Sequence, residues 1–61
     1  MRYAVYHPND PRKGTILPDR ELGQIVLGEG ETITKALAAA NASSGAMVWD
    51  RREKRVAYTV P

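Results

Sequence analysis

The sequence predicts a small α+β fold in which one helix packs on a three- or four-stranded antiparallel sheet, in the order strand, loop, strand, helix, strand, strand. Three observations lead to this prediction. Both ends of the chain carry β-rich runs, the middle carries one segment of helical periodicity, and 61 residues suffice for one small core only. We therefore expect residues 1–61 to form a single domain.

The first predicted strand spans residues 2–7, an aromatic and β-branched run that ends before Pro8. Residues 8–22 are expected to form a long loop, because prolines, a glycine and an Asn-Asp pair interrupt regular structure there. Loops of this length are uncommon in compact domains. We therefore expect Ile16 and Leu17 to attach the loop to the core or to form a brief extra strand.

A second strand is predicted at residues 23–28, a continuous β-rich run bounded by glycines. Apolar residues at helical spacing then predict an amphipathic helix over residues 32–42. Thr32 is the expected N-cap, although Lys35 occupies the position where a capping box would have Glu or Gln. Gly45 can adopt the positive φ that often follows a helix end.

The last residues predict a β-hairpin with strands at 46–50 and 55–60, joined by a charged turn that contains no glycine. Such a turn favours a loop built on a type I turn over a tight primed turn. A three-residue turn would place Trp49 opposite Arg55 on the outer face. A two- or four-residue turn would direct Trp49 and Met47 toward the core, because a one-residue slip moves every side chain to the other face. We favour the three-residue turn.

The predicted core combines alternate strand residues with one face of the helix. Its members are Val5, Ile25, Leu27, Ile33, Leu37, Val48, Val56 and Tyr58, with Ala36 and Ala40 allowing the helix to approach the sheet closely. A core of this size barely offsets the conformational entropy lost on folding, and the final strand is expected at a sheet edge. We therefore expect the chain to self-associate as a homodimer.

The sequence offers no arrangement of residues suited to catalysis. The one histidine, His7, lies in a proline-rich context, and no nucleophile with an orienting group accompanies it. A metal site built on His7 and Asp10 would need a preformed cage, which such loops rarely supply. The segment 28–30 meets neither of the phosphate-binding glycine motifs. We expect no enzymatic activity, no metal and no cofactor.

The most informative feature is a basic turn near the C-terminus. An outward Trp beside arginines combines residue types that are enriched at interface hot spots. The predicted partner-binding residues are Trp49, Arg51, Arg52, Lys54 and Arg55. Asp50 and Glu53 interrupt the patch, which favours a protein or ribonucleoprotein partner over a nucleic-acid-binding module that uses the same hairpin. A solvated structural turn is the third interpretation.

Composition also bears on location. The chain has no cysteine, which fits a reducing compartment. No apolar run approaches the roughly 20 residues that span a bilayer, and residues 1–4 lack the apolar core of a signal peptide. We expect a cytoplasmic protein that does not bind membranes.

A helix at 32–42 followed by a closing hairpin at 46–60, in a short chain with its own Met1, resembles the small phage-encoded proteins that block bacterial defence systems, anti-CRISPR proteins among them. The resemblance is one of layout and size, so it assigns no role to any residue. It implies a stoichiometric blocker of a host protein or ribonucleoprotein, acting through surface charge and a few anchoring side chains.

Overall fold

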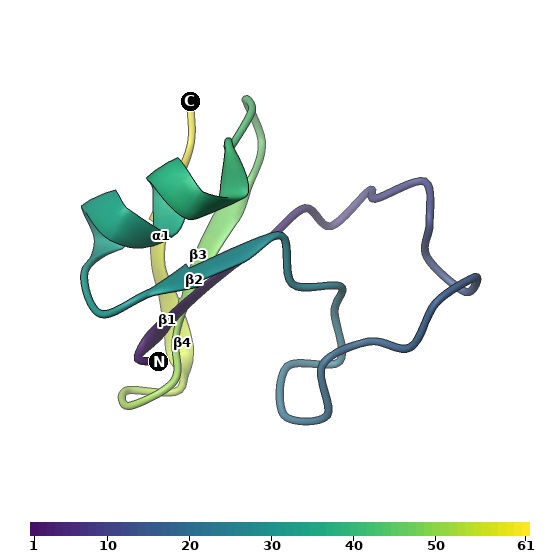
Figure 1. The fold of residues 1–61 in the computed structure, drawn as a ribbon, viewed down its shortest axis with the longest axis horizontal. Helices are drawn as coiled ribbons and strands as arrows, with labels where there is room; N and C mark the ends of the chain where they lie inside the picture. Colours follow the sequence, from purple (N-terminus) through teal and green to yellow (C-terminus); the bar gives the residue numbers. More distant parts are fainter.

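Four strands and one helix make up the fold, which a computed structural model describes over all of residues 1–61 (Figure 1). The elements are β1 (Tyr3–Tyr6), β2 (Gly28–Gly30), α1 (Ile33–Ala40), β3 (Met47–Asp50) and β4 (Arg55–Thr59). All strand pairs are antiparallel, and the sheet order is β2-β1-β3-β4. The predicted α+β class, with one helix on an antiparallel sheet, is confirmed.

The second strand lies further along the chain than the sequence predicted. Pairing with β1 begins only at Leu27, whose backbone N–H donates to the carbonyl of Val5 at 2.7 Å. The strand itself is Gly28–Gly30, so the prediction of residues 23–28 was wrong. The β-rich run is the approach to the strand, and the glycines expected to end it are the strand residues.

The position of α1 explains why glycines form this strand. A Cβ atom on Gly28 would lie 2.6 Å from the Cα of Ala40, and one on Gly30 would lie 2.6 Å from the backbone nitrogen of Ala36. Real Cβ atoms essentially never approach other atoms this closely. The helix backbone therefore rests directly on β2, at a distance that only glycine permits.

The ends of the helix agree with the predicted range of 32–42. The hydroxyl of Thr32 accepts a hydrogen bond from the backbone N–H of Lys35 at 3.1 Å, as expected of an N-cap. At the other end Asn41 takes the left-handed conformation, with φ 49°. Gly45 also has a positive φ of 90°, but it lies in the turn before β3 rather than at the helix cap.

The core lies between α1 and the centre of the sheet. Val5 and Val48 face each other across β1 and β3, and both are fully buried together with Ala36 and Ala46. Partly buried residues surround this cluster: Tyr3, Ile33, Leu37, Ala40, Ala42 and Val60. Leu27 is also only half-buried.

The predicted core extended too far toward the C-terminus. Val56 and Tyr58 are 39% and 43% exposed, so their assignment to the core was wrong. The reason is that α1 packs chiefly on β2 and β1, at the opposite side of the sheet order from β4. All five residues of β4 are therefore exposed.

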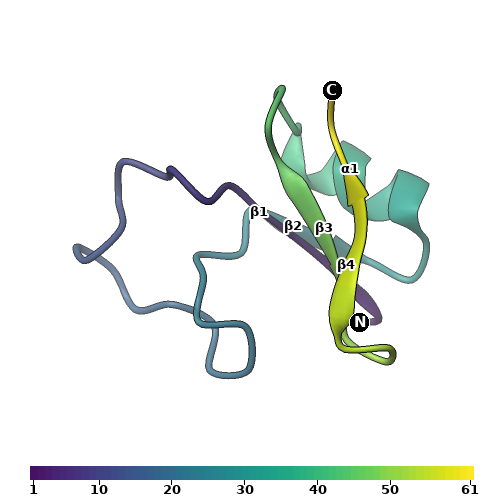
Figure 2. The ribbon, with the colours of Figure 1, turned by 180° about the vertical axis from the view of Figure 1, so that it is seen from behind.

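The face of the sheet turned away from α1 carries buried residues as well. Ala4 and Tyr6, which alternate with Val5 along β1, are both buried, and the Tyr6 hydroxyl donates to the sulfur of Met47 at 3.2 Å. The long loop between β1 and β2 leaves the strands on this side, opposite the helix (Figure 2). The sheet is thus covered by a helix on one face and by this loop on the other.

The loop is not attached through the residues that the sequence suggested. Ile16 is 47% exposed and Leu17 is 94% exposed, so neither reaches the core. The expected extra strand is reduced to an isolated bridge between Lys13 and Ile16. Ile25 is the one buried apolar side chain of the loop.

Candidate functional site

The basic turn contains four residues, 51–54, between the paired Asp50 and Arg55. Lys54 adopts a positive φ of 58°, and its backbone N–H donates to the carbonyl of Asp50 at 2.8 Å. The three-residue turn that we favoured, which would have paired Asp50 with Lys54, is therefore wrong.

An irregularity between β3 and β4 compensates for the longer turn. Trp49 pairs with Val56, but the register then shifts and Val48 pairs with Tyr58. Directly opposite residues in an antiparallel pair lie on the same face. Since Trp49 also pairs with Ala4, its side chain lies on the face turned away from α1, which is the orientation that we had favoured.

Trp49 is nevertheless not an exposed side chain. It is half-buried, and its indole Nε1 is inaccessible to solvent and has no hydrogen-bond partner. It lies on the face from which the long loop emerges (Figure 2). The indole is therefore partly packed within the fold rather than a free stacking surface.

Asp50 organises the turn, a role that the sequence reasoning missed. Its carboxylate accepts two hydrogen bonds from the guanidinium of Arg2, at 3.1 and 2.9 Å, and two more from the backbone N–H groups of Arg52 and Glu53. The Arg2 guanidinium lowers the pKa of Asp50 to about 2. The available signal was an Asp at the start of a turn, where its side chain commonly binds the following N–H groups.

Arg51 is engaged in ion pairs within the chain. Its guanidinium donates to the carboxylate of Asp19 in the long loop at 3.0 Å and to that of Glu29 in β2 at 3.1 Å. The Arg51 guanidinium, helped by the backbone N–H of Leu22, lowers the pKa of Asp19 to about 2. Arg51 thus fastens the loop to the hairpin.

Lys54 is paired in a similar way. Its ammonium donates to the carboxylate of Glu21 at 2.8 Å, which lowers the pKa of Glu21. Two of the four predicted basic residues are therefore neutralised by acidic groups of the same chain. The partners come from 32 and 33 residues earlier in the sequence, in a loop that offers no local signal of the contact.

Arg52 and Arg55 differ from these two, because neither forms an ion pair or a side-chain hydrogen bond. Both are exposed and lie at the start of β4, Arg52 in the preceding turn and Arg55 as the first residue of the strand that carries Val56 and Tyr58. We name the four residues Arg52, Arg55, Val56 and Tyr58 the β4 edge. The structure thus divides the predicted binding residues into free arginines and residues that hold the fold.

His7 is occupied at both ring nitrogens. The backbone N–H of Asn9 donates to its Nδ1 at 3.1 Å, and its Nε2 lies 3.3 Å from the carbonyl of Ser44. An Nδ1 that accepts implies that Nε2 carries the proton and donates. The imidazole therefore bridges the start of the loop and the segment before β3. No group of three or more His, Cys, Asp or Glu side chains in the chain is arranged to hold a metal ion.

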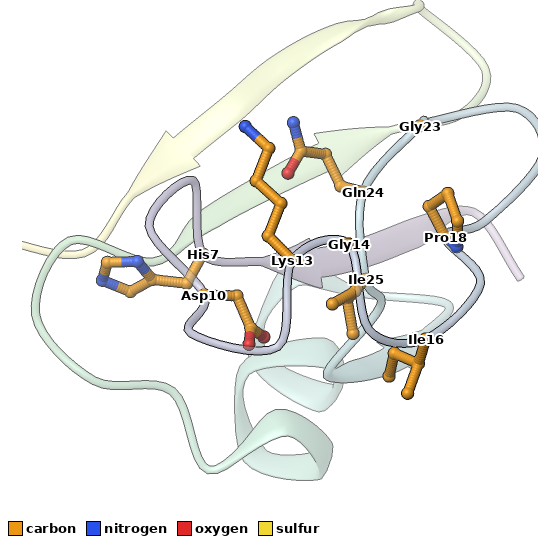
Figure 3. A pocket seen from close by; sticks show the side chains of 9 residues that line it. All are labelled: His7, Asp10, Lys13, Gly14, Ile16, Pro18, Gly23, Gln24 and Ile25. Atoms are coloured by element: carbon orange, nitrogen blue, oxygen red, sulfur yellow. The ribbon is translucent and has the colours of Figure 1, made fainter.

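The long loop also encloses a hollow of about 280 Å³ (Figure 3). Its walls come from the start of the loop, near His7 and Lys13, and from its return segment, near Gln24 and Ile25. No pattern in the sequence pointed to this hollow, because it forms only where the loop folds back on itself.

Comparison with protein-family models, with curated proteins and with solved structures gave no match to this chain. The only helix, α1, is too short to cross a membrane.

Proposed function

We propose that this chain is a non-catalytic binding protein, a small stoichiometric inhibitor or modulator that docks on a host protein or ribonucleoprotein through the β4 edge. The observation that carries the proposal is that Arg52 and Arg55, which form no ion pair within the chain, lie at the start of a strand whose residues are all exposed. Arg and Tyr are among the residue types most enriched at interface hot spots. By the strand register, Val56 lies on the face of Trp49 and Tyr58 lies on the face of Val48, so the β4 edge offers exposed apolar area on both sides of the strand.

The β4 edge is supported by a rigid base. Asp50 ties the turn to Arg2, which directly precedes β1, so hydrogen bonds fix the turn that carries Arg52. A preorganised surface loses little conformational entropy on binding, and this favours affinity per unit of buried area. This geometry supports a docking surface rather than a merely solvated turn.

The distribution of free charge favours a protein surface over a nucleic acid backbone. Affinity for nucleic acids rises with the number of phosphates that cations neutralise. Arg51 and Lys54 are already paired with carboxylates, so the hairpin keeps two free cations, Arg52 and Arg55. Two cations at one end of a strand with exposed apolar side chains suit a mixed acidic and apolar patch on a protein.

An anti-CRISPR-like blocker is the specific form of this proposal that the layout of the chain suggests. Such a blocker occupies a functional surface of its target and needs no catalytic group. A target of this kind works in the cytoplasm, and we propose the same location for this chain.

Affinity capture from a lysate of the native host, using the tagged chain, tests the proposal. Arg52→Glu and Arg55→Glu, each made singly, should lose the specific partner, because each reverses one free charge on the docking surface. Lys35→Glu is the matched control, since Lys35 is an exposed cation on α1 that the proposal leaves outside the interface. The captured species is then purified and the complex is reconstituted with each variant.

Two results would contradict the proposal. One is a reconstituted complex that forms equally well with all three variants. The other is tight binding of generic duplex DNA or RNA that falls steeply with added salt, which would identify a nucleic-acid-binding module instead.

A further inference from the structure

The hollow under the long loop has two chemically different sides. Ile16, Pro18 and Ile25 contribute apolar surface, whereas Lys13 and Gln24 contribute an ammonium and an amide. In the view of Figure 3 the ends of the Lys13 and Gln24 side chains lie on one side and the three apolar side chains lie on the other. The volume of about 280 Å³ is just below the usual range of small-ligand sites, about 300–1,000 Å³, so only a small ligand would fit.

The other polar groups in the wall are already satisfied. The carboxylate of Asp10 binds the guanidinium of Arg12 through two hydrogen bonds, at 3.1 and 2.9 Å, and also accepts the Arg12 backbone N–H. Both nitrogens of His7 are engaged, as described above. The side chains of Lys13 and Gln24 form no hydrogen bond or ion pair with the rest of the chain. Lys13 and Gln24 therefore each bring to the lining of the hollow a side chain whose polar end has no partner within the chain.

Backbone hydrogen bonds within the loop hold both segments that form the walls of the hollow. At the far end of the loop, the N–H of Asp19 donates to the carbonyl of Gln24, and the N–H of Gly23 donates back to the carbonyl of Asp19, both at 2.8 Å. At the near end, the N–H of Thr15 donates to the carbonyl of Arg12 at 2.8 Å. Ion pairing of Asp19 also holds the loop to the hairpin. A site that is formed in advance loses little entropy when a ligand enters.

We propose that this hollow binds a small aliphatic carboxylate. The carboxylate would accept from the ammonium of Lys13 and the amide of Gln24, and the hydrocarbon chain would lie on Ile16, Pro18 and Ile25. A free fatty acid of medium length and a peptide terminus with an apolar last residue share this chemistry. The inference does not depend on the proposed function of the β4 edge, because none of its residues lines the hollow.

Titration of the ¹⁵N-labelled chain with octanoate tests the proposal. We expect saturable shifts of the amide resonances of Gly14, Gly23 and Gln24, with a dissociation constant of about 1 mM for a ligand of this size. An acetylated dipeptide that ends in Leu, titrated in parallel, distinguishes the two sources of the carboxylate. Octylamine has a chain of the same length and the opposite charge, and we expect it not to bind.

Two variants separate a specific site from general attraction. Lys13→Gln should weaken octanoate binding by about tenfold or more, whereas Arg20→Gln, which removes the same charge from the same loop outside the hollow, should leave it unchanged. The spectrum of each variant shows whether the fold is retained. The proposal is overturned if neither carboxylate gives saturable shifts, if octylamine binds as well as octanoate, or if the two variants bind octanoate equally.

Discussion

The two faces of the sheet are covered by different physical means. On one face, α1 approaches β2 so closely that only glycine fits at Gly28 and Gly30, and small apolar side chains fill the interface. On the other face, a long loop is held by Ile25 and by ion pairs to the hairpin. Close steric packing therefore holds the helix to the sheet, whereas ion pairs hold the loop to the hairpin. These ion pairs occupy Arg51 and Lys54, two of the four basic residues that the sequence predicted to bind a partner.

The largest effect on stability is expected on the helix side. Gly28→Ala would place a methyl group against the backbone of Ala40. Because backbone atoms of α1 cannot move aside as a flexible side chain could, we expect a loss of about 3 kcal/mol or more in the free energy of unfolding. Gly14→Ala is the comparison, because Gly14 has open space around it and only a positive φ of 85° to strain. It should cost about 1 kcal/mol. Urea denaturation measures both, and equal losses would mean that close approach is not what β2 requires.

The packing of Trp49 sharpens the comparison on the loop side. Trp49→Ala should cost about 2–3 kcal/mol, since a half-buried ring is lost from the face turned away from α1. Trp49→Phe should cost clearly less, because it keeps ring area and removes a buried N–H that has no partner. Thermal unfolding of both variants tests this order. If Trp49→Ala unfolds like the wild type, the indole is a surface group after all.

Acid should weaken two contacts, that of Asp19, which holds the loop to the hairpin, and that of Asp50, which holds the turn. Arg51 holds the pKa of Asp19 at about 2, and Arg2 holds that of Asp50 at about 2, both below the ordinary value of 3.8. A depressed pKa in the folded state stabilises the fold above the unfolded value, and this contribution is lost as pH falls from about 4 toward 2. We expect unfolding free energy to fall over this window. Asp19→Asn should be less stable at neutral pH yet lose less on acidification, and a wild-type slope in that variant would contradict the assignment.

The smallest effect is expected at the start of α1. Lys35→Glu places a carboxylate three residues after the Thr32 cap, which completes a capping box and puts negative charge near the helix N-terminus. We expect a gain of about 0.5 kcal/mol in the free energy of unfolding. A loss in the same denaturation assay would show that the Lys35 side chain makes a contact that the substitution removes.

The fold class and most elements could be predicted because their signals are local. Thr32 marks the helix start, and alternation marks β1 and the hairpin. The position of β2 could not be predicted, because it depends on how closely the following helix, α1, approaches Gly28. Likewise, the turn is one residue longer than expected, and a register shift between Val48 and Trp49 accompanies it. Trp49 lies on the expected face, away from α1, although the turn expected to place it there is not the one that forms.

The binding surface was only half predictable for a related reason. Nothing near Arg51 or Lys54 in the sequence distinguishes them from Arg52 and Arg55. Their neutralisation depends on acidic residues of a loop whose path is set by tertiary contacts. The expected homodimer stays a prediction, and β4 is the edge strand on which it would form.

The division of the hairpin into free and paired cations is tested most directly by three variants that each remove one positive charge from it. Calorimetric titration of the reconstituted partner should show that Arg52→Gln and Arg55→Gln weaken binding by about tenfold or more, because these arginines are free to contact the partner. Lys54→Gln should leave the affinity almost unchanged, because Lys54 is already paired with Glu21. Equal weakening by all three variants would mean that net charge alone attracts the partner, and it would contradict the assignment of the β4 edge.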